Sequence, residues 1–285
     1  MLPAEELTVI CNTGDDLEHW GVHVSPDVDA VLYRLAGIFD EAAGFGILGD
    51  SQRVFEHMRK LGEPGWFRLG DSDLAHCLLR SQVLRAGGRL TDACLQLAVR
   101  LGVGPRVLPM SDDSVRTRFE TSAGCLSFQE YFAREHARPA VTGIELVGIE
   151  TAKPSAEARA AVEASELIVI GPSNPLISIE PILRLLGPCI DPARTLAVTP
   201  IVAGRSLKGP TVEMMRTLGL DPTPAGVAQR YRRHARWFVL DNRDAALEEH
   251  IRALGYRVVT TDTVMGPAAG RRRLAADILD AVGAC

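Results

Sequence analysis

The sequence of 285 residues lacks several patterns that would assign it to a specialised class. It contains no Cys-x-x-Cys pair, and no histidine lies at zinc-finger spacing from two of its six cysteines. It has no uncharged apolar run of roughly 18 residues, so we expect no membrane-spanning helix. Its first residues do not have the basic and apolar regions of a signal peptide. We therefore expect six reduced thiols, most of them buried, in a cytoplasmic protein.

Excess positive charge is also absent: 31 Lys and Arg residues stand against 36 Asp and Glu residues, a formal net charge of −5. Binding to nucleic acid or to a membrane surface needs net or clustered positive charge, so we expect neither partner. Internal repeats are lacking, as are the GxSxG, HExxH, complete P-loop and GxGxxG motifs. What remains is the composition of an ordinary globular protein, 46% hydrophobic and 24% charged.

Short apolar runs alternate with amphipathic segments along most of the chain. The expected strands are residues 7–11, 106–110, 143–149, 167–170, 195–198, 237–241 and 257–261, with a hairpin of residues 116–121 and 124–128. The expected helices are residues 29–39, 73–84, 90–101 and 155–164, the third with Thr91 as its N-cap. This alternation indicates an α/β fold with a Rossmann-like parallel sheet and helices on both faces. We expect a single domain over residues 1–285, with a helical insertion at about 29–101.

Four of the expected strands end in turns made of small, polar or glycine residues. These turns are residues 12–16, 111–113, 171–175 and 199–201. Ligands of an open parallel sheet bind beyond the carboxyl ends of its strands, where glycine allows close approach and free amides attract anions. We expect Ser173 and Asn174 to add hydrogen bonds to phosphate oxygens. Ordinary strand-to-helix turns are the alternative.

Aspartates occur as close pairs in or near such turns: Asp15 and Asp16, Asp27 and Asp29, Asp71 and Asp73, and Asp112 and Asp113. A carboxylate pair beside phosphates is typical of a hard divalent cation such as Mg²⁺. Helix capping is the alternative for residues 27, 29, 71 and 73, because they precede or open expected helices. The two roles are compatible for different members of one pair.

Seven segments follow one another in an order that resembles the 2-phospho-L-lactate transferases of deazaflavin coenzyme (coenzyme F420) biosynthesis. They are residues 12–16, 25–33, 70–76, 108–113, 171–175, 199–201 and 262–265. The resemblance implies a Mg²⁺-dependent transfer of a phospholactyl or phosphoenolpyruvyl group from a guanosine-diphosphate-linked donor to the ribityl hydroxyl of the deazaflavin Fo. The products would be GMP and coenzyme F420-0 or its dehydro form. The resemblance also implies a Rossmann-like fold with a helical insertion, and a homodimer.

Matched residue by residue, the resemblance places Asp27 and Asp29 where the family contacts the deazaflavin and the attacking hydroxyl. Asp29 is expected to orient that hydroxyl, as general base or as metal ligand, and Asp15 is the second expected metal ligand. As an exposed strand-end residue, Asp29 is expected to affect function rather than folding. The expected substrate-binding residues are Asn12, Thr13, Asp15, Asp16, Ser25, Asp71, Ser72, Asp73, His76, Arg80, Ser111, Asp112, Gly171, Pro172, Ser173, Asn174, Thr199 and Pro200.

Two features depart from the family's pattern. The family normally begins with another strand and a glycine-rich loop that supplies amides to the donor, and we expect a sheet without that strand to have an unpaired edge. Ser72 stands where many relatives carry Arg, a bidentate partner that Ser cannot imitate, so Arg80 and Arg85 are the candidates to compensate. These departures favour one alternative to a transferase, a catalytically silent nucleotide-binding regulator like the related gluconeogenesis-factor-like proteins. A generic α/β enzyme that acts on another nucleotide is the remaining alternative.

Overall fold

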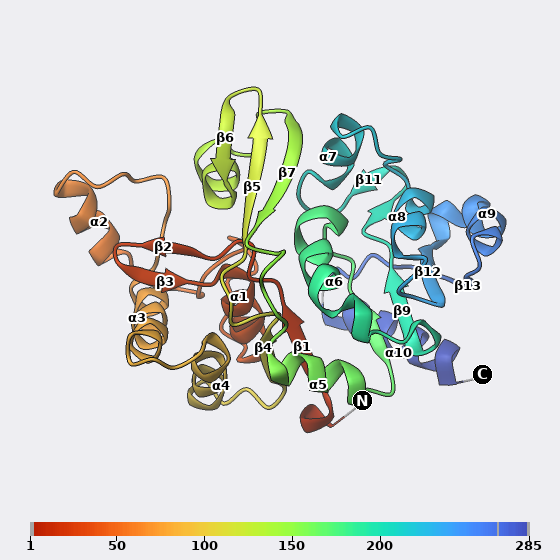
Figure 1. Cartoon of the computed structure of the whole chain (residues 1–285), viewed down its shortest axis with the longest axis horizontal. Coiled ribbons are helices and arrows are strands. Elements are labelled where there is room, and N and C mark those ends of the chain that lie inside the picture. Colours follow the sequence, from red (N-terminus) through yellow and green to blue (C-terminus); the bar gives the residue numbers. More distant parts are fainter. Residues whose placement is uncertain (1–2, 267, 284–285) are drawn as a thin grey trace. The chain divides into compact units, whose positions relative to one another are not determined.

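The computed structural model describes residues 3–266 and 268–283, and it has a mixed α/β fold (Figure 1). The chain forms two compact units. The first comprises Met1–Pro139, Gly143–Ala161 and Arg184–Leu186, and the second comprises Ala140–Thr142, Val162–Leu183 and Gly187–Cys285. Cys285 lies outside the described residues, and the other five cysteines are free. Within the described part, no helix is long and apolar enough to span a membrane.

Two parallel strands form the central sheet of the first unit. Strand β1 (Thr8–Cys11) pairs with β4 (Arg106–Pro109), so the two carboxyl ends lie side by side. Helices α1 (Pro26–Leu35) and α4 (Leu90–Arg100) pack against this pair through an apolar core. That core includes Val28, Leu32, Cys94, Leu97 and Val107. The turn after β1 therefore follows a strand that is fixed in a well-packed apolar core.

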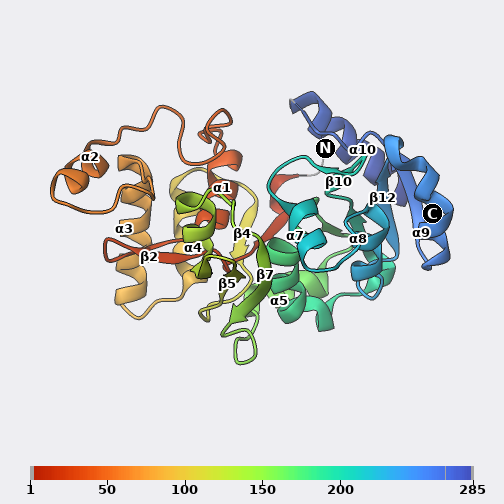
Figure 2. The ribbon, with the colours of Figure 1, turned by 90° about the horizontal axis from the view of Figure 1, so that it is seen from above.

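The remaining helices of the first unit stand beside a short hairpin. Helix α3 (Asp71–Arg85) lies along both α4 and strand β3 (Val22–Val24), which pairs with β2 (Leu17–His19) (Figure 2). Helix α2 (Arg53–Lys60) contacts α3. All four helices lie between β1 and β4 in the sequence, the place of the expected helical insertion. The hairpin and α2 are absent from the sequence-based prediction.

A second sheet of the first unit has the order β6-β5-β7. Strands β5 (Arg116–Thr121) and β6 (Gly124–Ser127) form the predicted hairpin, and its turn needs the positive φ of +104° that Gly124 adopts. Strand β7 (Val141–Val147) completes the sheet, and helix α5 (Ala156–Ala164) follows it. The π-helix η2 (Glu130–Arg134) follows β6, and its Tyr131 packs on Phe119.

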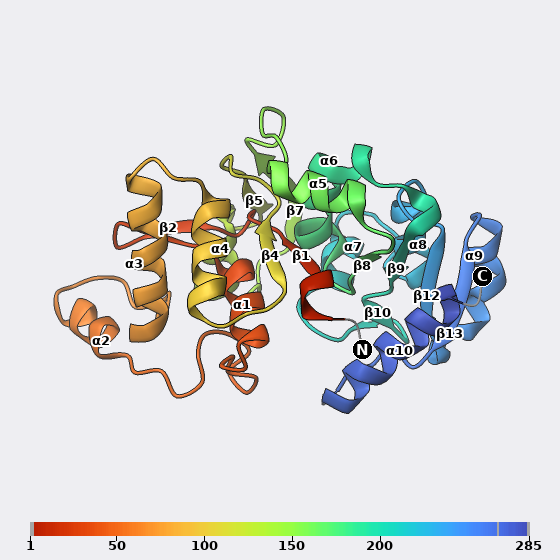
Figure 3. The same ribbon diagram turned by 90° about the horizontal axis from the view of Figure 1, so that it is seen from below.

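The second unit contains a parallel sheet of four strands. Their order is β13 (Arg257–Thr261), β12 (Trp237–Asp241), β9 (Thr195–Val198) and β8 (Ile168–Ile170) (Figure 3). Side chains alternate across a strand, and both faces are covered. Trp237 and Val239 pack against α10 (Ala268–Gly283). Phe238, on the opposite face, contacts Tyr256, whose hydroxyl donates to a carbonyl of α8 (Pro224–Tyr231).

Shorter elements complete the fold. They are η1 (Ala4–Glu6), η3 (Pro175–Ile179), α6 (Glu180–Leu186), η4 (Gly187–Cys189), η5 (Pro192–Arg194), β10 (Ile201–Val202), β11 (Arg205–Ser206), α7 (Thr211–Thr217), η6 (Asn242–Leu247) and α9 (Glu248–Ala253). Strands β10 and β11 pair with each other.

Two details differ from the sequence-based prediction. The parallel strands form two separate hydrogen-bonded sheets, because β1 pairs only with β4 and β8 only with β9 among the described residues. Each of these two strands therefore lies at an edge of its sheet. The prediction that Thr91 caps α4 is wrong: Arg89 is the N-cap, and the carboxylate of Asp92 accepts its backbone N–H at 3.0 Å and its guanidinium at 2.7 Å.

Candidate active site

The turn after β1 is fixed by hydrogen bonds from three directions. The side-chain oxygen of Asn12 accepts the backbone N–H of Gly14 at 2.9 Å, and its amide donates to Oδ2 of Asp27 at 3.1 Å. The side chain of Gln129 donates to the carbonyl of Asp15 at 3.3 Å. A Cβ on Gly14 would lie only 2.6 Å from the hydroxyl oxygen of Thr117. The turn therefore needs glycine here for space, and it has little freedom to shift.

Four carboxylates gather around this turn: those of Asp15, Asp16 and Asp29 are buried, and that of Asp27 is half-buried. Burial raises the pKa of Asp15 well above its ordinary value, and repulsion from Asp27 and Asp16 raises it further. Burial also raises the pKa of Asp27, against the lowering effect of the Asn12 hydrogen bond. So much buried negative charge is costly unless a cation compensates it.

Asp16 is satisfied by the protein itself. Its Oδ1 accepts the hydroxyl of Ser25 at 2.6 Å, and its Oδ2 lies 2.9 Å from Nε2 of His23. Asp16 thereby connects the turn to strand β3 through His23. It also connects the turn to the start of α1 through Ser25, the residue before that helix. Both residues hold the site together, and neither has a buried polar atom free for a ligand in the described structure.

Two carboxylate oxygens remain without a partner among the described residues: Oδ1 of Asp15 and Oδ2 of Asp29, both buried. The buried hydroxyl of Thr13 is unpartnered as well. Asp29 is near enough to raise the pKa of Asp15 by electrostatic repulsion. Carboxylate and hydroxyl oxygens are the donors that a hard divalent cation prefers. The residues present therefore fit the cation that the sequence predicts.

Asp29 differs from its expected position in one respect. It lies in the first turn of α1, is only 4% exposed, and its Oδ1 accepts a hydrogen bond from the guanidinium of Arg80. The expectation of an exposed strand-end residue is therefore wrong, because the helix begins at Pro26 and turns Asp29 inward. Its replacement will affect folding as well as function, since Arg80 is fully buried and would lose its counter-charge.

A second acidic group adjoins Asp29 on α3. The hydroxyl of Tyr33 donates to Oδ1 of Asp73 at 2.7 Å, and Nδ1 of His76 lies 3.0 Å from the same hydroxyl. Burial, with repulsion from Asp29 as the next cause, raises the pKa of Asp73 to about 7. Asp73 and His76 are both half-buried, and Asp73 lies beside Asp29 in the same acidic cluster.

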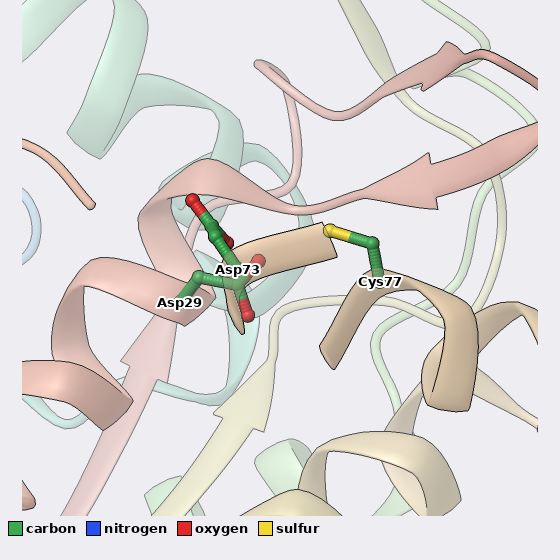
Figure 4. A group of neighbouring side chains, drawn as sticks. All are labelled: Asp29, Asp73 and Cys77. Atoms are coloured by element: carbon green, nitrogen blue, oxygen red, sulfur yellow. The ribbon is translucent and has the colours of Figure 1, made fainter. Parts of the chain in front are cut away.

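Asp29, Asp73 and Cys77 offer ligand atoms within 4.8 Å of one another (Figure 4). This group is a poorer cation site than the oxygens of Asp15 and Asp29. Burial raises the pKa of Cys77, which keeps its thiol protonated, and the guanidinium of Arg80 already approaches its sulfur at 3.8 Å.

Asp71 and Ser72 lie apart from the cluster, with Ser72 exposed. Asp71 accepts the hydroxyl of Ser51 and the backbone N–H groups of Arg53 and Val54, so it caps α2 rather than its own helix. The cap of α3 is Asp50, which accepts from the backbone of Ser72 and was not predicted.

Arg80 and Arg85, the candidates to compensate for the absence of an arginine at position 72, form hydrogen bonds with other parts of the protein. Arg80 pairs with Asp29, and Arg85 donates to the carbonyl of Gly21. The guanidinium groups of both therefore serve the packing of α3 against its neighbours.

The turn after β4 is held by its own polar side chains. The hydroxyl of Ser111 donates to the carbonyl of Lys153 at 2.5 Å, and Oδ1 of Asp112 accepts the backbone N–H of Thr91 at 2.8 Å. Ser111 and Asp112 are thus committed to the turn and to the start of α4.

The predicted phosphate-binding residues of the second unit fall into two groups. A Cβ on Gly171 would meet no atom within 4 Å, and Ser173 is exposed, so both are open to a ligand; Pro172 is half-buried beside them. The side chains of the others are used internally. The side-chain oxygen of Asn174 caps η3 by accepting the backbone N–H of Leu176. The hydroxyl of Thr199 donates to the carbonyl of Ile201, and Pro200 between them is buried.

Several supporting residues are missing from the sequence-based prediction. Thr117 and Gln129 reach the turn after β1 from distant segments, so no local spacing reveals them. In the second unit, the fully buried Asp241 accepts from the backbone and hydroxyl of Thr263 at 2.8 and 2.9 Å. Asp241 ends an apolar strand, which is the one signal that could have identified it.

Comparison with known proteins places the chain in a family. Residues 2–278 match the model of the family described as 2-phospho-L-lactate transferase CofD. A 2-phospho-L-lactate transferase of Methanosarcina acetivorans is 38% identical over 277 residues, which cover 96% of this chain and 90% of the relative. A phosphoenolpyruvate transferase of Kitasatospora aureofaciens is 38% identical over 238 residues, 80% of this chain and 74% of the relative.

A solved structure shares the fold at low sequence identity. A protein member of the UPF0052 family from Bacillus halodurans superposes with a TM-score of 0.57 and 17% identity, over 95% of this chain and 90% of that protein. The match over the length of the chain and the identity to named transferases agree with the resemblance that the sequence motifs indicate. The chain therefore belongs to the 2-phospho-L-lactate transferase family and is a transferase.

Proposed function

We propose that the protein transfers a 2-phospho-L-lactyl or phosphoenolpyruvyl group from a guanosine-diphosphate-linked donor to the ribityl hydroxyl of Fo, in coenzyme F420 biosynthesis. The names of the relatives, a 2-phospho-L-lactate transferase and a phosphoenolpyruvate transferase, support the choice of the transferred group. The observation that carries the assignment of the site is the buried carboxylate cluster after β1, with the unpartnered oxygens of Asp15 and Asp29.

Mg²⁺ belongs to this proposal, and Oδ1 of Asp15 and Oδ2 of Asp29 are the protein atoms that would hold it. When bound, Mg²⁺ would neutralise negative charge on the transferring phosphoryl group. The rigid turn supports this role, because Asn12 and Gln129 fix its backbone before a ligand arrives.

The reaction forms one P–O bond and breaks another. The hydroxyl oxygen of Fo attacks the phosphorus that carries the lactyl or enolpyruvyl group, and the bridging oxygen leaves with its electron pair as part of GMP. The hydroxyl loses its proton, and we assign Asp29 to orient the hydroxyl and Asp27 to receive that proton. Backbone near Gly171 and the exposed Ser173 are assigned to the phosphates of the donor.

An assay with Fo, the guanosine-diphosphate-linked donor and Mg²⁺ tests this proposal, with GMP and the deazaflavin product both quantified by chromatography. We expect equal amounts of the two products, and loss of both with Asp29→Asn. The matched control is Asp280→Asn, which removes an exposed carboxylate from the surface of α10. Nucleotide binding without transfer under all donor conditions would contradict the proposal and favour the silent regulator.

We also propose that the protein acts in the cytoplasm as a homodimer. Light scattering in solution tests the dimer.

A further inference from the structure

Arg80 is the only arginine among the described residues that is completely buried. It lies in the middle of α3, and its guanidinium has three neighbours. One N–H group donates to Oδ1 of Asp29, and another donates to the carbonyl of His23 at 3.2 Å and approaches the sulfur of Cys77 at 3.8 Å. A buried guanidinium is costly to desolvate, so such a residue persists only where its contacts compensate that cost.

The contact with Asp29 restricts what that carboxylate can do. A charge-assisted hydrogen bond to Oδ1 fixes the plane of the carboxylate and leaves Oδ2 as its single unpartnered oxygen. Partners of this kind behind a metal ligand orient it, and their loss lowers metal affinity even though they never touch the metal.

Arg80 also joins the two halves of the cluster. By donating to the carbonyl of His23, it holds strand β3 against α3, and the ring of His23 in turn lies 2.9 Å from Oδ2 of Asp16. The same strand is held a second time, because the backbone N–H of His23 donates to the hydroxyl of Ser81 at 2.7 Å. The orientation of Asp29 therefore depends on the guanidinium of Arg80, which shares with Ser81 the attachment of β3 to α3.

We propose that Arg80 is a positioning residue, which holds Asp29 so that its Oδ2 binds the divalent cation together with Asp15. This inference rests on the proposed function, since it concerns the cation of that same site. Arg80 acts through Asp29 and has no contact with the substrates. A lysine cannot replace it fully, because one ammonium on a flexible stem cannot reproduce the planar fork that reaches two acceptors on different elements.

Binding of Mn²⁺ to the protein alone, followed by calorimetry and by the electron paramagnetic resonance of free Mn²⁺, tests the proposal without any turnover. We expect the Mn²⁺ dissociation constant to rise about 10- to 100-fold in Arg80→Met and less in Arg80→Lys. The matched control is Arg85→Lys on the same helix, whose guanidinium donates to the carbonyl of Gly21 and to no carboxylate. It should bind Mn²⁺ as the parent does.

Coupling to Asp29 separates positioning from a general loss of structure. If Arg80 acts through Asp29, Arg80→Met should have no further effect on Mn²⁺ affinity in a protein that already carries Asp29→Asn. An equal loss in both backgrounds would overturn the proposal. Should Arg80→Met fail to fold, as judged by circular dichroism, Arg80→Lys decides alone: a parent-like dissociation constant overturns the proposal, and a raised one supports it.

The same Mn²⁺ titration separates a failure of the inference about Arg80 from a failure of the proposed function. Parent-like affinity in every folded Arg80 variant removes the positioning role and leaves the proposed function standing. Absence of Mn²⁺ binding in the parent protein contradicts the cation site itself, and with it both the proposed role of Asp15 and Asp29 and the inference about Arg80.

Discussion

The hydroxyl of Tyr33 donates a 2.7 Å hydrogen bond to Oδ1 of Asp73 and so joins α1 to α3 across 40 residues of sequence. This bond lowers the pKa of Asp73, against burial and the repulsion of Asp29, which raise it. Tyr33 therefore stabilises the ionised form of a carboxyl group that its surroundings otherwise keep neutral. The stability of the ionised carboxylates in the acidic cluster therefore depends on the Tyr33–Asp73 hydrogen bond as well as on Arg80.

Tyr33→Phe should destabilise the protein by about 1–3 kcal/mol at pH 8, because the ionised Asp73 loses a buried donor. The loss should be smaller at pH 5, where Asp73 is neutral. Urea denaturation at both pH values measures the difference. Tyr231→Phe in the second unit is the matched control: its hydroxyl is buried without a partner among the described residues, so its removal should cost little at either pH. Equal losses in the two variants would contradict the role of the Tyr33 bond.

Asp73 should make the stability of the metal-free protein depend on pH. Its pKa is about 7 in the folded chain and near 3.8 when unfolded, so between these values the folded state binds more protons. The unfolding free energy should therefore fall as pH rises from 5 to 7, by roughly 1 kcal/mol per pH unit from this group. Asp73→Asn should remove this slope. Denaturant titrations of parent and variant in buffer with a chelator provide the comparison, and an unchanged slope would refute the assignment.

The strands of the second unit could be predicted almost to the residue, because a buried parallel strand is a continuous apolar run. Thr195–Val198, Trp237–Asp241 and Arg257–Thr261 have the predicted bounds. The hairpin of β2 and β3 could not be predicted, since each strand has three residues and its turn places Trp20 at a positive φ of +50°. A bulky residue gives no sequence signal for that conformation.

The acidic members of the site were predictable from their spacing, whereas their partners were not. Asp15 and Asp29 lie in motifs at the end of a strand and at the start of a helix, and the structure places both in one cluster. Arg80 is predicted from the sequence as a substrate-binding residue, and its burial depends on Asp29, 51 positions away. Long-range ion pairs of this kind follow from packing, which periodicity does not encode.

Removal of divalent cations should lower the melting temperature of the parent protein. A cation that binds only the folded state stabilises it by mass action, about 2.7 kcal/mol when its concentration is 100 times the dissociation constant. Thermal scans with excess Mg²⁺ and with chelator should therefore differ in the parent and coincide in Asp29→Asn, which lacks a charged ligand. A shift of the same size in the variant would show that Mg²⁺ acts elsewhere.

Gly14→Ala should destabilise the turn after β1, because the new Cβ would lie 2.6 Å from the hydroxyl oxygen of Thr117 and 3.0 Å from Oδ1 of Asn12. Overpacking of this kind costs about 1–3 kcal/mol. Thr117→Ala removes the nearer obstacle, so the double variant should be more stable than the sum of the two single changes predicts. Gly171→Ala, whose Cβ would meet no atom within 4 Å, is the control for glycine replacement itself. Strict additivity of the two changes in urea denaturation would show that the turn moves away from Thr117 and is less rigid than its hydrogen bonds imply.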